Sequence, residues 1–253
     1  MRVLIACEFS GTVRDAFTRA GHEAMSCDLL PSETPGLHYQ GDVTDILDMD
    51  WDLMIAHPPC TYLSVSGMHW TTRGLRDPQL TEDALEFVQF LLDAPIPRIA
   101  LENPISVISS RIRKPDQIIQ PWWFGHDASK KTCLWLKGLT PLTPTEVYPP
   151  SGYKVIKFGT EMSSCECCDE PWCNDCETHF ADCDCYGPTQ DDIKYKEIDG
   201  VLFGSDEDIK PLWGNQTPSG QNKLGPSKDR WKIRSKTYQG IADAMATQWG
   251  KII

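Results

Sequence analysis

The sequence predicts an α/β domain built on a mostly parallel sheet and followed by a small irregular insertion. Three observations support this prediction. Short apolar runs alternate with helical patterns over residues 1–142. Each apolar run stops at a turn signal or a polar residue. The alternation then breaks down, and residues 143–230 are rich in Pro, Gly and Cys instead.

The expected elements follow from the spacing of apolar residues. Short apolar runs predict strands at 2–7, 23–29, 52–56, 98–101 and 132–136. Apolar residues at helical spacing predict helices at 12–20, 80–92 and 237–249. We therefore expect three parts in the 253 residues: an α/β domain at 1–142, an insert region at 143–230 and a C-terminal segment at 231–253 that packs back on the first domain.

Charge is distributed unevenly along the chain. The formal net charge is −12, which by itself disfavours a nucleic-acid partner. Eight acidic residues and no Lys or Arg lie between Glu161 and Asp184, so the rest of the chain carries only −4. The segment from Lys223 to Lys236 contains six basic residues and only one acidic residue, Asp229. It also contains Trp231. A surface that contacts phosphates therefore remains possible, and a solvated charged loop is the alternative.

Some locations and classes are disfavoured. Hydrophobic residues make up 40% of the chain, too many for a disordered protein. No run approaches the ~18 apolar residues that span a bilayer. The N-terminal sequence MRVLIACEFSG has neither a spacer nor a small-residue cleavage site. We expect a protein of the cytoplasm, without a membrane partner.

Polar and small residues follow the predicted strands, where ligands bind in open α/β sheets. A small residue in the first turn lets a ligand approach the backbone, and an acid after the second strand suits ribose hydroxyls. Each feature alone also fits a plain turn, a cap or a structural thiol. Together they predict an adenosine cofactor pocket, and the residues concerned are Glu8-Phe9-Ser10-Gly11, Asp28, Gly41-Asp42, Pro58-Pro59-Cys60 and Glu102-Asn103-Pro104.

The order of these motifs resembles the DNA cytosine-5 methyltransferase family. The resemblance covers residues 3–142, and it is most specific over 5–11 and 57–64. Residues 234–246 (RSKTYQGIADAMA) resemble the closing C-terminal motif of the family. The chain is most similar to small phage and prophage members, where methylation would shield DNA from host restriction. The resemblance implies a Rossmann-like methyltransferase fold, S-adenosylmethionine as cofactor and DNA as partner.

The resemblance also implies roles for individual residues. Cys60 would be the nucleophile, and Glu102 would hold the base at N3 and the exocyclic amine. Lys131, in the Lys130-Lys131 pair, aligns with an arginine-bearing motif and could hold O2 of the base or a phosphate, or the pair could simply be solvated. The remaining assignments are Phe9, Ser10 and Gly11 lining the S-adenosylmethionine site, Asp28 on the ribose, Asp42 on the adenine amino group and Pro58 in the cytosine pocket wall.

The sequence departs from the family at two places besides the lysine pair. Thr12-Val13-Arg14 stands where the family has more glycine, and Glu8 stands where leucine is common. The chemistry nevertheless agrees with the assignment. Carbon 5 of cytosine becomes nucleophilic only after a nucleophile adds at carbon 6, and a thiolate both adds and leaves well.

Seven cysteines and one histidine lie within 21 positions. Clustered thiols in a reducing compartment are typical of a zinc site, with a redox or disulfide cluster as the alternative. Eight soft ligands suffice for two tetrahedral sites, and the segment has no apolar core of its own. We therefore expect zinc held among Cys165, Cys167, Cys168, Cys173, Cys176, His179, Cys183 and Cys185.

Two other functions remain open beside a DNA cytosine-5 methyltransferase. The same chemistry could act on RNA or a free pyrimidine nucleotide, which the acidic composition favours. The chain could also be a catalytically silent, methyltransferase-like DNA-binding module. The intact Pro-Pro-Cys and Glu-Asn-Pro motifs disfavour the silent module, because a pure binding protein needs neither.

Overall fold

The computed structural model describes residues 1–158, 172–173, 178–179, 194–205 and 209–251. The chain divides into two compact units. The first unit is formed by Met1–Glu146 together with Gly225–Ile253, and the second by Val147–Leu224. The residues expected to carry the chemistry all belong to the first unit, whereas the cysteine cluster belongs to the second.

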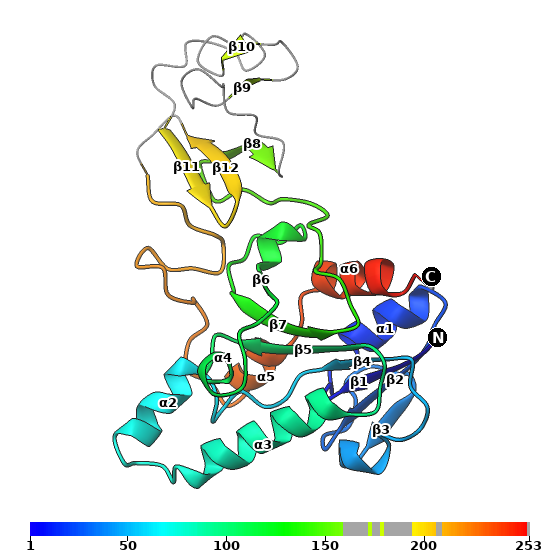
Figure 1. Cartoon of the computed structure of the whole chain (residues 1–253). Helices are drawn as coiled ribbons and strands as arrows, with labels where there is room; N and C mark the ends of the chain where they lie inside the picture. The colour runs from blue at the N-terminus through cyan, green and yellow to red at the C-terminus, as the bar shows by residue number, and fades with distance from the viewer. Residues whose placement is uncertain (159–171, 174–177, 180–193, 206–208, 252–253) are drawn as a thin grey trace. The chain divides into compact units, whose positions relative to one another are not determined.

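The first unit alternates strands and helices along the chain (Figure 1). Its elements are β1 (Arg2–Ala6), α1 (Thr12–Arg19), β2 (Glu23–Asp28), β3 (His38–Gln40), η1 (Val43–Asp45), β4 (Leu53–Ala56), α2 (Val65–Thr72), α3 (Gln79–Asp93), β5 (Ile99–Pro104), α4 (Ile108–Arg111), β6 (Gln117–Ile119), η2 (Pro121–Trp123), β7 (Thr132–Lys137), α5 (Arg230–Ser235) and α6 (Gln239–Trp249).

These strands form one seven-stranded sheet in the order β3-β2-β1-β4-β5-β7-β6. The five strands from β3 to β5 run parallel, and β7 pairs antiparallel with both β5 and β6. The chain order reverses between β1 and β4, and ligands bind at the carboxyl ends of strands beside such a reversal. The fold class expected from the sequence is confirmed: this is a mostly parallel, Rossmann-like α/β sheet.

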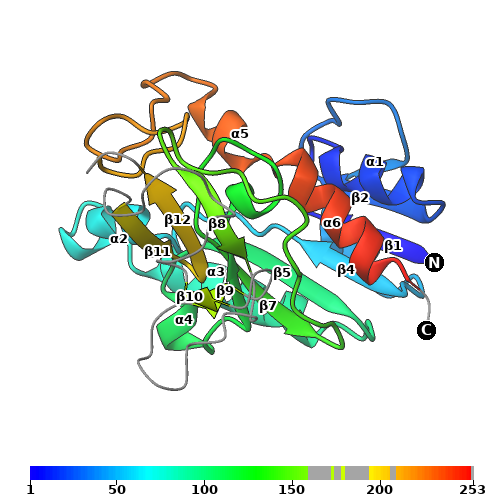
Figure 2. The same ribbon diagram turned by 90° about the horizontal axis from the view of Figure 1, so that it is seen from above.

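Both faces of the sheet are buried, which explains why its central strands are apolar without interruption. Successive residues of a strand point to opposite faces. Val3 and Ile5 pack with α1 and α6, whereas Leu4 and Ala6 pack with α3 in a second core cluster. Figure 2 shows α6 lying along α1, as their contacts require.

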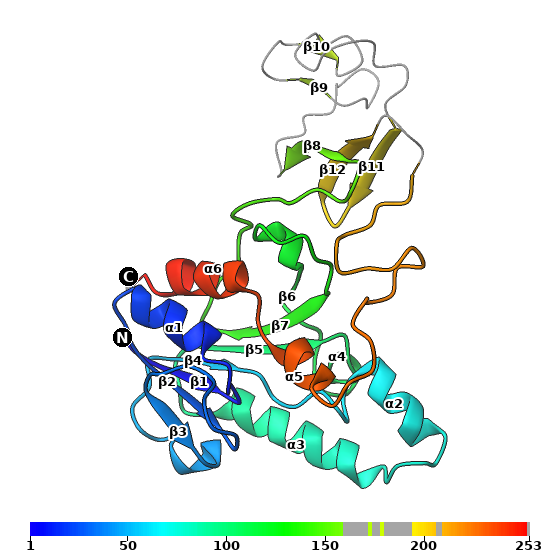
Figure 3. The same cartoon turned by 180° about the vertical axis from the view of Figure 1, so that it is seen from behind.

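The C-terminal segment returns to the first unit after the second unit has been completed. Figure 3 shows α5 leading into α6, which lies against α1. Ile241, Met245 and Trp249 of α6 are buried in the core cluster that contains Phe17 of α1. The Trp249 Nε1–H donates to Thr140 O over 2.8 Å. Helix α6 therefore shares a buried core with α1 and the central strands of the sheet.

The second unit contains strands that the sequence did not reveal. β8 (Lys154–Phe158), β11 (Lys194–Ile198) and β12 (Val201–Ser205) form a three-stranded antiparallel sheet in the order β11-β12-β8. The sequence interpretation of this region as irregular missed them, because the sheet depends on pairing between β12 and β8, which lies far away in sequence. A separate pair, β9 (Trp172–Cys173) and β10 (Thr178–His179), is antiparallel.

None of the helices in the described part of the chain has the length and apolarity that crossing a membrane would require.

Candidate active site

The turn that follows β1 contains a buried carboxylate side chain, that of Glu8. Glu8 follows β1 and is buried, and its carboxylate accepts hydrogen bonds from the Val13 amide over 2.7 Å and the Arg14 amide over 3.2 Å. The Ser10 hydroxyl donates to the same carboxylate over 3.2 Å. Backbone amides at a helix N-terminus otherwise attract phosphate or carboxylate ligands. At α1 this position is occupied by the chain's own side chain.

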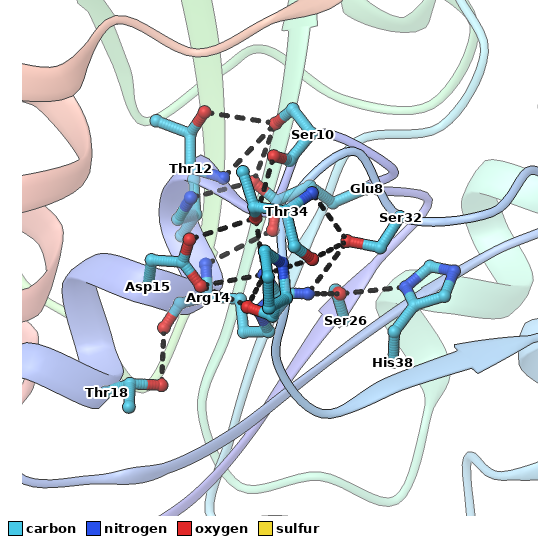
Figure 4. A network of polar contacts seen from close by, with 12 residues as sticks. Glu8, Ser10, Thr12, Arg14, Asp15, Thr18, Ser26, Ser32, Thr34 and His38 are labelled. Atoms are coloured by element: carbon cyan, nitrogen blue, oxygen red, sulfur yellow. Dashed lines mark hydrogen bonds and ion pairs between the residues drawn. The ribbon is translucent and has the colours of Figure 1, made fainter.

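Arg14 extends this network below the turn (Figure 4). The guanidinium is only 1% exposed, and it donates to Ser26 Oγ over 3.1 Å and Ser32 Oγ over 3.0 Å. It also donates to Thr34 Oγ1 over 2.6 Å. A buried guanidinium requires such a complete set of acceptors. Arg14 therefore fixes α1 to β2 and to the loop at 32–36.

Gly11 is required by this packing. Its φ of 75° lies in the left-handed region, and a Cβ there would lie 2.2 Å from Thr34 Oγ1 and 2.4 Å from an Arg14 nitrogen. Phe9 and Ser10 beside it are each 7% exposed. The three residues predicted to line the cofactor site thus form one tight turn at the carboxyl end of β1.

The two acids predicted to hold the adenosine lie at the ends of neighbouring strands. Asp28 ends β2, and burial raises its pKa although the Leu30 amide and His38 oppose this effect. Asp42 follows β3, and hydrogen bonds from the Thr44 amide and hydroxyl lower its pKa. Both carboxylates, after burial itself, raise the pKa of the Cys7 thiol. Asp28 and Asp42 therefore gather near Cys7 on the same side of the sheet as Phe9.

The Pro-Pro-Cys turn begins where β4 ends. Asn103 of β5 donates from Nδ2 to Pro58 O over 2.9 Å, which fixes the turn to the neighbouring strand. Cys60 is exposed, and its carbonyl accepts the Ser64 amide over 2.9 Å. The Ser64 hydroxyl then caps α2 by accepting the Gly67 amide over 3.2 Å. A rigid turn thus presents the thiol at the edge of the sheet.

Glu102 lies beside this turn and forms a buried pair with His57. β4 and β5 are parallel with Ala56 opposite Leu101, so the next residue of each strand comes side by side. His57 Nδ1 lies 3.1 Å from Glu102 Oε2. Burial alone would raise the pKa of Glu102, but the His57 hydrogen bond, the Lys130 charge and the Thr132 hydroxyl outweigh it and lower the pKa.

Although Cys60 as a residue is exposed, the surrounding protein shields its thiol from part of the solvent, and this desolvation first and the Glu102 carboxylate second raise the pKa of the thiol. The charges of Lys130 and Arg234 oppose this effect. The thiolate is the nucleophilic form of cysteine, so both cations favour reactivity. Cys60, Glu102 and Lys130 are therefore close enough to influence one another's charge.

The cation beside Glu102 and Cys60 is Lys130. Its ammonium donates to the Arg234 carbonyl over 3.0 Å, and its backbone amide donates to the buried Gln120 Oε1 over 3.0 Å. Lys131, the residue singled out from the sequence, is exposed.

Helix α5 contacts the carboxyl edge of the sheet at two places, at Phe9 after β1 and at Lys130 before β7. The Trp231 ring lies 5.9 Å from the Phe9 ring on the cofactor side. On the catalytic side, the Arg234 carbonyl accepts from Lys130. Lys236 Nζ lies 2.5 Å from a carboxylate oxygen of Glu33, beyond β2. The basic segment seen in the sequence therefore borders both the predicted cofactor pocket and Cys60.

Most of the predicted zinc cluster lies outside the described residues. This applies to Cys165, Cys167, Cys168, Cys176, Cys183 and Cys185. Of the other two, Cys173 pairs in register with Thr178, and His179 pairs with Trp172. Within the described ranges, no three His, Cys, Asp or Glu residues form a group that could hold a metal ion. The zinc site stays a prediction.

His57 and Lys130 were not singled out from the sequence. His57 directly follows the apolar residues of β4, and Glu102 directly follows the apolar residues 99–101 of β5, so the same rule would have found His57. Lys130 could not be separated from Lys131 by sequence, because the direction of each side chain depends on where β7 begins.

Comparison with known proteins gives a distant likeness only. No protein-family model matches the chain, and no curated protein matches it. An E. coli prophage protein assigned as a DNA modification methyltransferase is similar in structure, with 16% identity, a TM-score of 0.39 and coverage of 59% of this chain and 52% of that one. The methyltransferase EhMeth of Entamoeba histolytica gives 15% identity, a TM-score of 0.41 and coverage of 59% and 58%.

The matched part of this chain thus covers little more than half of either of these solved proteins. At these values the activity of this chain has to be inferred from its own residues.

Proposed function

We propose that this protein is an S-adenosylmethionine-dependent DNA cytosine-5 methyltransferase that uses Cys60 as its nucleophile. The observation that carries the proposal is the juxtaposition of an exposed cysteine on a rigid Pro-Pro turn, a buried carboxyl at Glu102 and the Lys130 cation. A thiolate and a carboxyl that can exchange a proton are the two groups that addition to a cytosine ring requires.

In this proposal Cys60 attacks carbon 6 of the cytosine. Glu102 holds N3 and stabilises the charge that develops on the ring during the attack. The charge of Lys130 opposes the rise in the pKa of Cys60 and favours its thiolate form. Carbon 5 then accepts the methyl group that bound S-adenosylmethionine would supply, and loss of the carbon 5 proton to solvent and elimination of the Cys60 thiolate restore the ring. Because carbon 6 is hidden in a duplex, the base must be flipped out or the substrate must be single-stranded.

The first turn of the sheet fits a cofactor that contains adenosine but no phosphate. Glu8 occupies the N-terminus of α1, so a pyrophosphate there would meet a carboxylate instead of unpaired amides. S-adenosylmethionine carries a cationic sulfonium and supplies an electrophilic methyl group. Phe9, Ser10 and Gly11 would line its site, while Asp28 and Asp42 would bind the ribose and the adenine.

DNA as the substrate is supported by α5 and the residues around it. Its basic side chains are at least partly exposed, and Trp231 is 52% exposed. Cations interleaved with aromatic rings suit a phosphate backbone with accessible bases. The segment also borders Cys60, where the target base would lie.

The test is covalent trapping on oligonucleotides that contain 5-fluorocytosine, with S-adenosylmethionine present. Fluorine cannot leave as a proton does, so the enzyme stays attached. Duplex DNA, single-stranded DNA and RNA of one sequence are compared. We expect a denaturation-resistant adduct on DNA that is absent in Cys60→Ala and present in Cys133→Ala, a matched change of a buried thiol.

The possible outcomes separate the candidate functions. An adduct on RNA alone would move the substrate to RNA. Absence of an adduct on every polymer, from protein that binds S-adenosylmethionine, would contradict the proposal.

We also propose that the cysteine cluster binds zinc and stabilises the second unit. Metal analysis of the purified chain should find one or two zinc ions, and removal by a chelator should unfold the second unit while the first unit stays folded. Limited proteolysis with and without chelator measures this difference. A protein without zinc whose eight ligand positions form disulfides would contradict it.

A further inference from the structure

His57 is tied to the carboxyl group that would hold the base. The parallel register of β4 and β5 brings His57 beside Glu102. Nδ1 lies 3.1 Å from Oε2, and the two side chains are only 9% and 11% exposed. Two such buried titratable groups in direct contact share their protons, so the charge of one depends on the charge of the other.

A Glu102 carboxylate is by itself a poor partner for N3 of cytosine. Both groups are hydrogen-bond acceptors, so a bond between them requires a proton. Burial favours that proton on Glu102, but His57, Lys130 and Thr132 together lower the pKa of the carboxyl. Glu102 alone therefore holds no proton for N3 near neutral pH.

The imidazole of His57 is suited to hold this proton. Histidine is the side chain whose ordinary pKa lies closest to neutrality. Nδ1 faces Glu102, and the buried Nε2 has no hydrogen-bond partner among the described residues. The described surroundings thus impose neither a donor nor an acceptor role on Nε2, and the ring can exist as an imidazole or an imidazolium.

The other groups that face the pair do not replace His57 in this role. Lys130 supplies a fixed positive charge, and Thr132 donates a hydroxyl hydrogen bond. The pKa of the Cys60 thiol and that of the Cys133 thiol are each raised by burial first and by the charge of Glu102 second, although Cys133 packs on the opposite face of the sheet from Glu102. Both thiols are therefore weaker acids than an imidazolium.

We propose that His57 is a positioning residue for Glu102 and the source of the proton that Glu102 passes to N3 of the cytosine. This inference rests on the proposed methylation of cytosine. The Nδ1–H bond of the imidazolium breaks and leaves its electron pair on the ring. The carboxylate relays the proton, and the lone pair of N3 forms the new N–H bond. An imidazolium and a neutral base become an imidazole and a cationic base, and Glu102 remains an anion.

The experiment compares His57→Asn with wild type across a pH range. Asparagine retains an N–H donor near the position of Nδ1 but carries no ionisable proton. Single-turnover methylation is measured on the DNA form that the wild type traps, and the variant rate is divided by the wild-type rate at each pH. This ratio cancels the ionisation of Cys60. His22→Asn, on the turn that precedes β2, is the matched control.

The expected defect grows with pH. Without the imidazole, N3 must take its proton from the Glu102 carboxyl alone, and a carboxyl gives up its proton at a lower pH than an imidazolium does, so the ratio of variant to wild-type rate should fall by about tenfold between about pH 5.5 and about pH 8. A defect of the same size at every pH would mean that His57 only orients Glu102. Such a result, or no defect at all, would overturn the proton-source inference while leaving the proposed function intact.

Two controls keep the outcome decisive. A wild type that forms no 5-fluorocytosine adduct on any nucleic acid refutes the proposed function, and the role of His57 fails with it. If His57→Asn does not fold, as judged by melting and S-adenosylmethionine binding, nitrogen-15 NMR of histidine-labelled wild type decides. His57 should change from imidazolium in the free enzyme to neutral imidazole in the trapped adduct, and an unchanged charge would overturn the inference.

Discussion

The carboxyl edge of the sheet has two halves, the proposed cofactor side around Glu8 and the proposed catalytic side around Cys60. They differ in how completely their buried polar groups are hydrogen-bonded. On the cofactor side, Glu8 and Arg14 are surrounded by hydrogen-bond partners from the chain itself. On the catalytic side, described polar atoms remain buried without a partner, namely His57 Nε2, Asn103 Oδ1 and Ser106 Oγ. A buried polar group without a partner destabilises the fold, and such groups concentrate where a ligand completes them.

This difference indicates that the two sides contribute differently to stability and to reaction rate. The cofactor side is completed by folding, so it should contribute chiefly to stability and to the shape of the pocket. In the proposed function the partners missing on the catalytic side are supplied by the substrate base, so changes there should affect rate more than stability. Substitutions on each side can separate these two contributions.

The largest expected effect is on catalysis. Glu102→Gln should lower the single-turnover methylation rate by about 10²–10⁴-fold, the usual range for a group that transfers a proton in the transition state. Binding of S-adenosylmethionine, measured by calorimetry, should not change. Glu86→Gln, an exposed change on α3, is the matched control. A Glu102→Gln enzyme with the wild-type rate would remove the carboxyl from the proposed chemistry.

The next largest effect is on stability. Arg14→Met should reduce the free energy of unfolding by about 3–5 kcal/mol, because it leaves Asp15 and the hydroxyls of Ser26, Ser32 and Thr34 without their cation. Arg19→Met on the same helix removes an exposed ion pair with Asp243 and should change stability by less than ~1 kcal/mol. Urea unfolding measures both. Equal effects would show that the Arg14 network does not hold the first turn.

A smaller effect separates the two adjacent lysines. Loss of the Lys130 charge raises the pKa of Cys60 further, so Lys130→Met should lower the rate by about tenfold near neutral pH and move the pH–rate profile to higher pH. Lys131→Met should leave the profile unchanged. The reverse result would return the role to Lys131, the residue chosen from the sequence.

The smallest expected effect is the contribution of Glu102 to acid stability. Its pKa in the folded state is lower than the ordinary value of 4.5, so the stabilisation that it provides is present above pH 4.5 and is lost as the pH falls through the folded value. Urea unfolding below pH 4.5 should therefore show a shallower loss of stability in Glu102→Gln than in wild type. An identical pH dependence would contradict the lowered pKa.

Much of the first unit was predictable from the sequence, because its central strands are buried on both faces and read as short apolar runs. The edge strands β3 and β6 were missed, since three residues give no periodicity. Helix α2 was missed because its apolar residues Val65 and Trp70 are exposed, so no apolar stripe marks it. The sheet of β8, β11 and β12 depends on pairing between distant segments, which the sequence does not specify locally.

The candidate site was predictable where it depends on strand ends. Cys60 follows β4, whereas Glu102 lies in β5. Because these two strands pair in parallel, they bring the two residues to the same edge of the sheet. The contacts of Arg14 and Lys130 were not predictable, because each reaches residues far along the chain. Arg14 bonds to the loop at 32–36, and Lys130 bonds to Arg234 across 104 positions.

The bond between Lys130 and Arg234 has an evolutionary consequence, because its acceptor is a backbone carbonyl. Any residue at position 234 supplies the same carbonyl, so substitutions along α5 can alter the outward-facing side chains without loosening the cation beside Cys60. In the proposed function, such substitutions can therefore change which nucleic-acid sequences α5 favours while the surroundings of Cys60 are preserved.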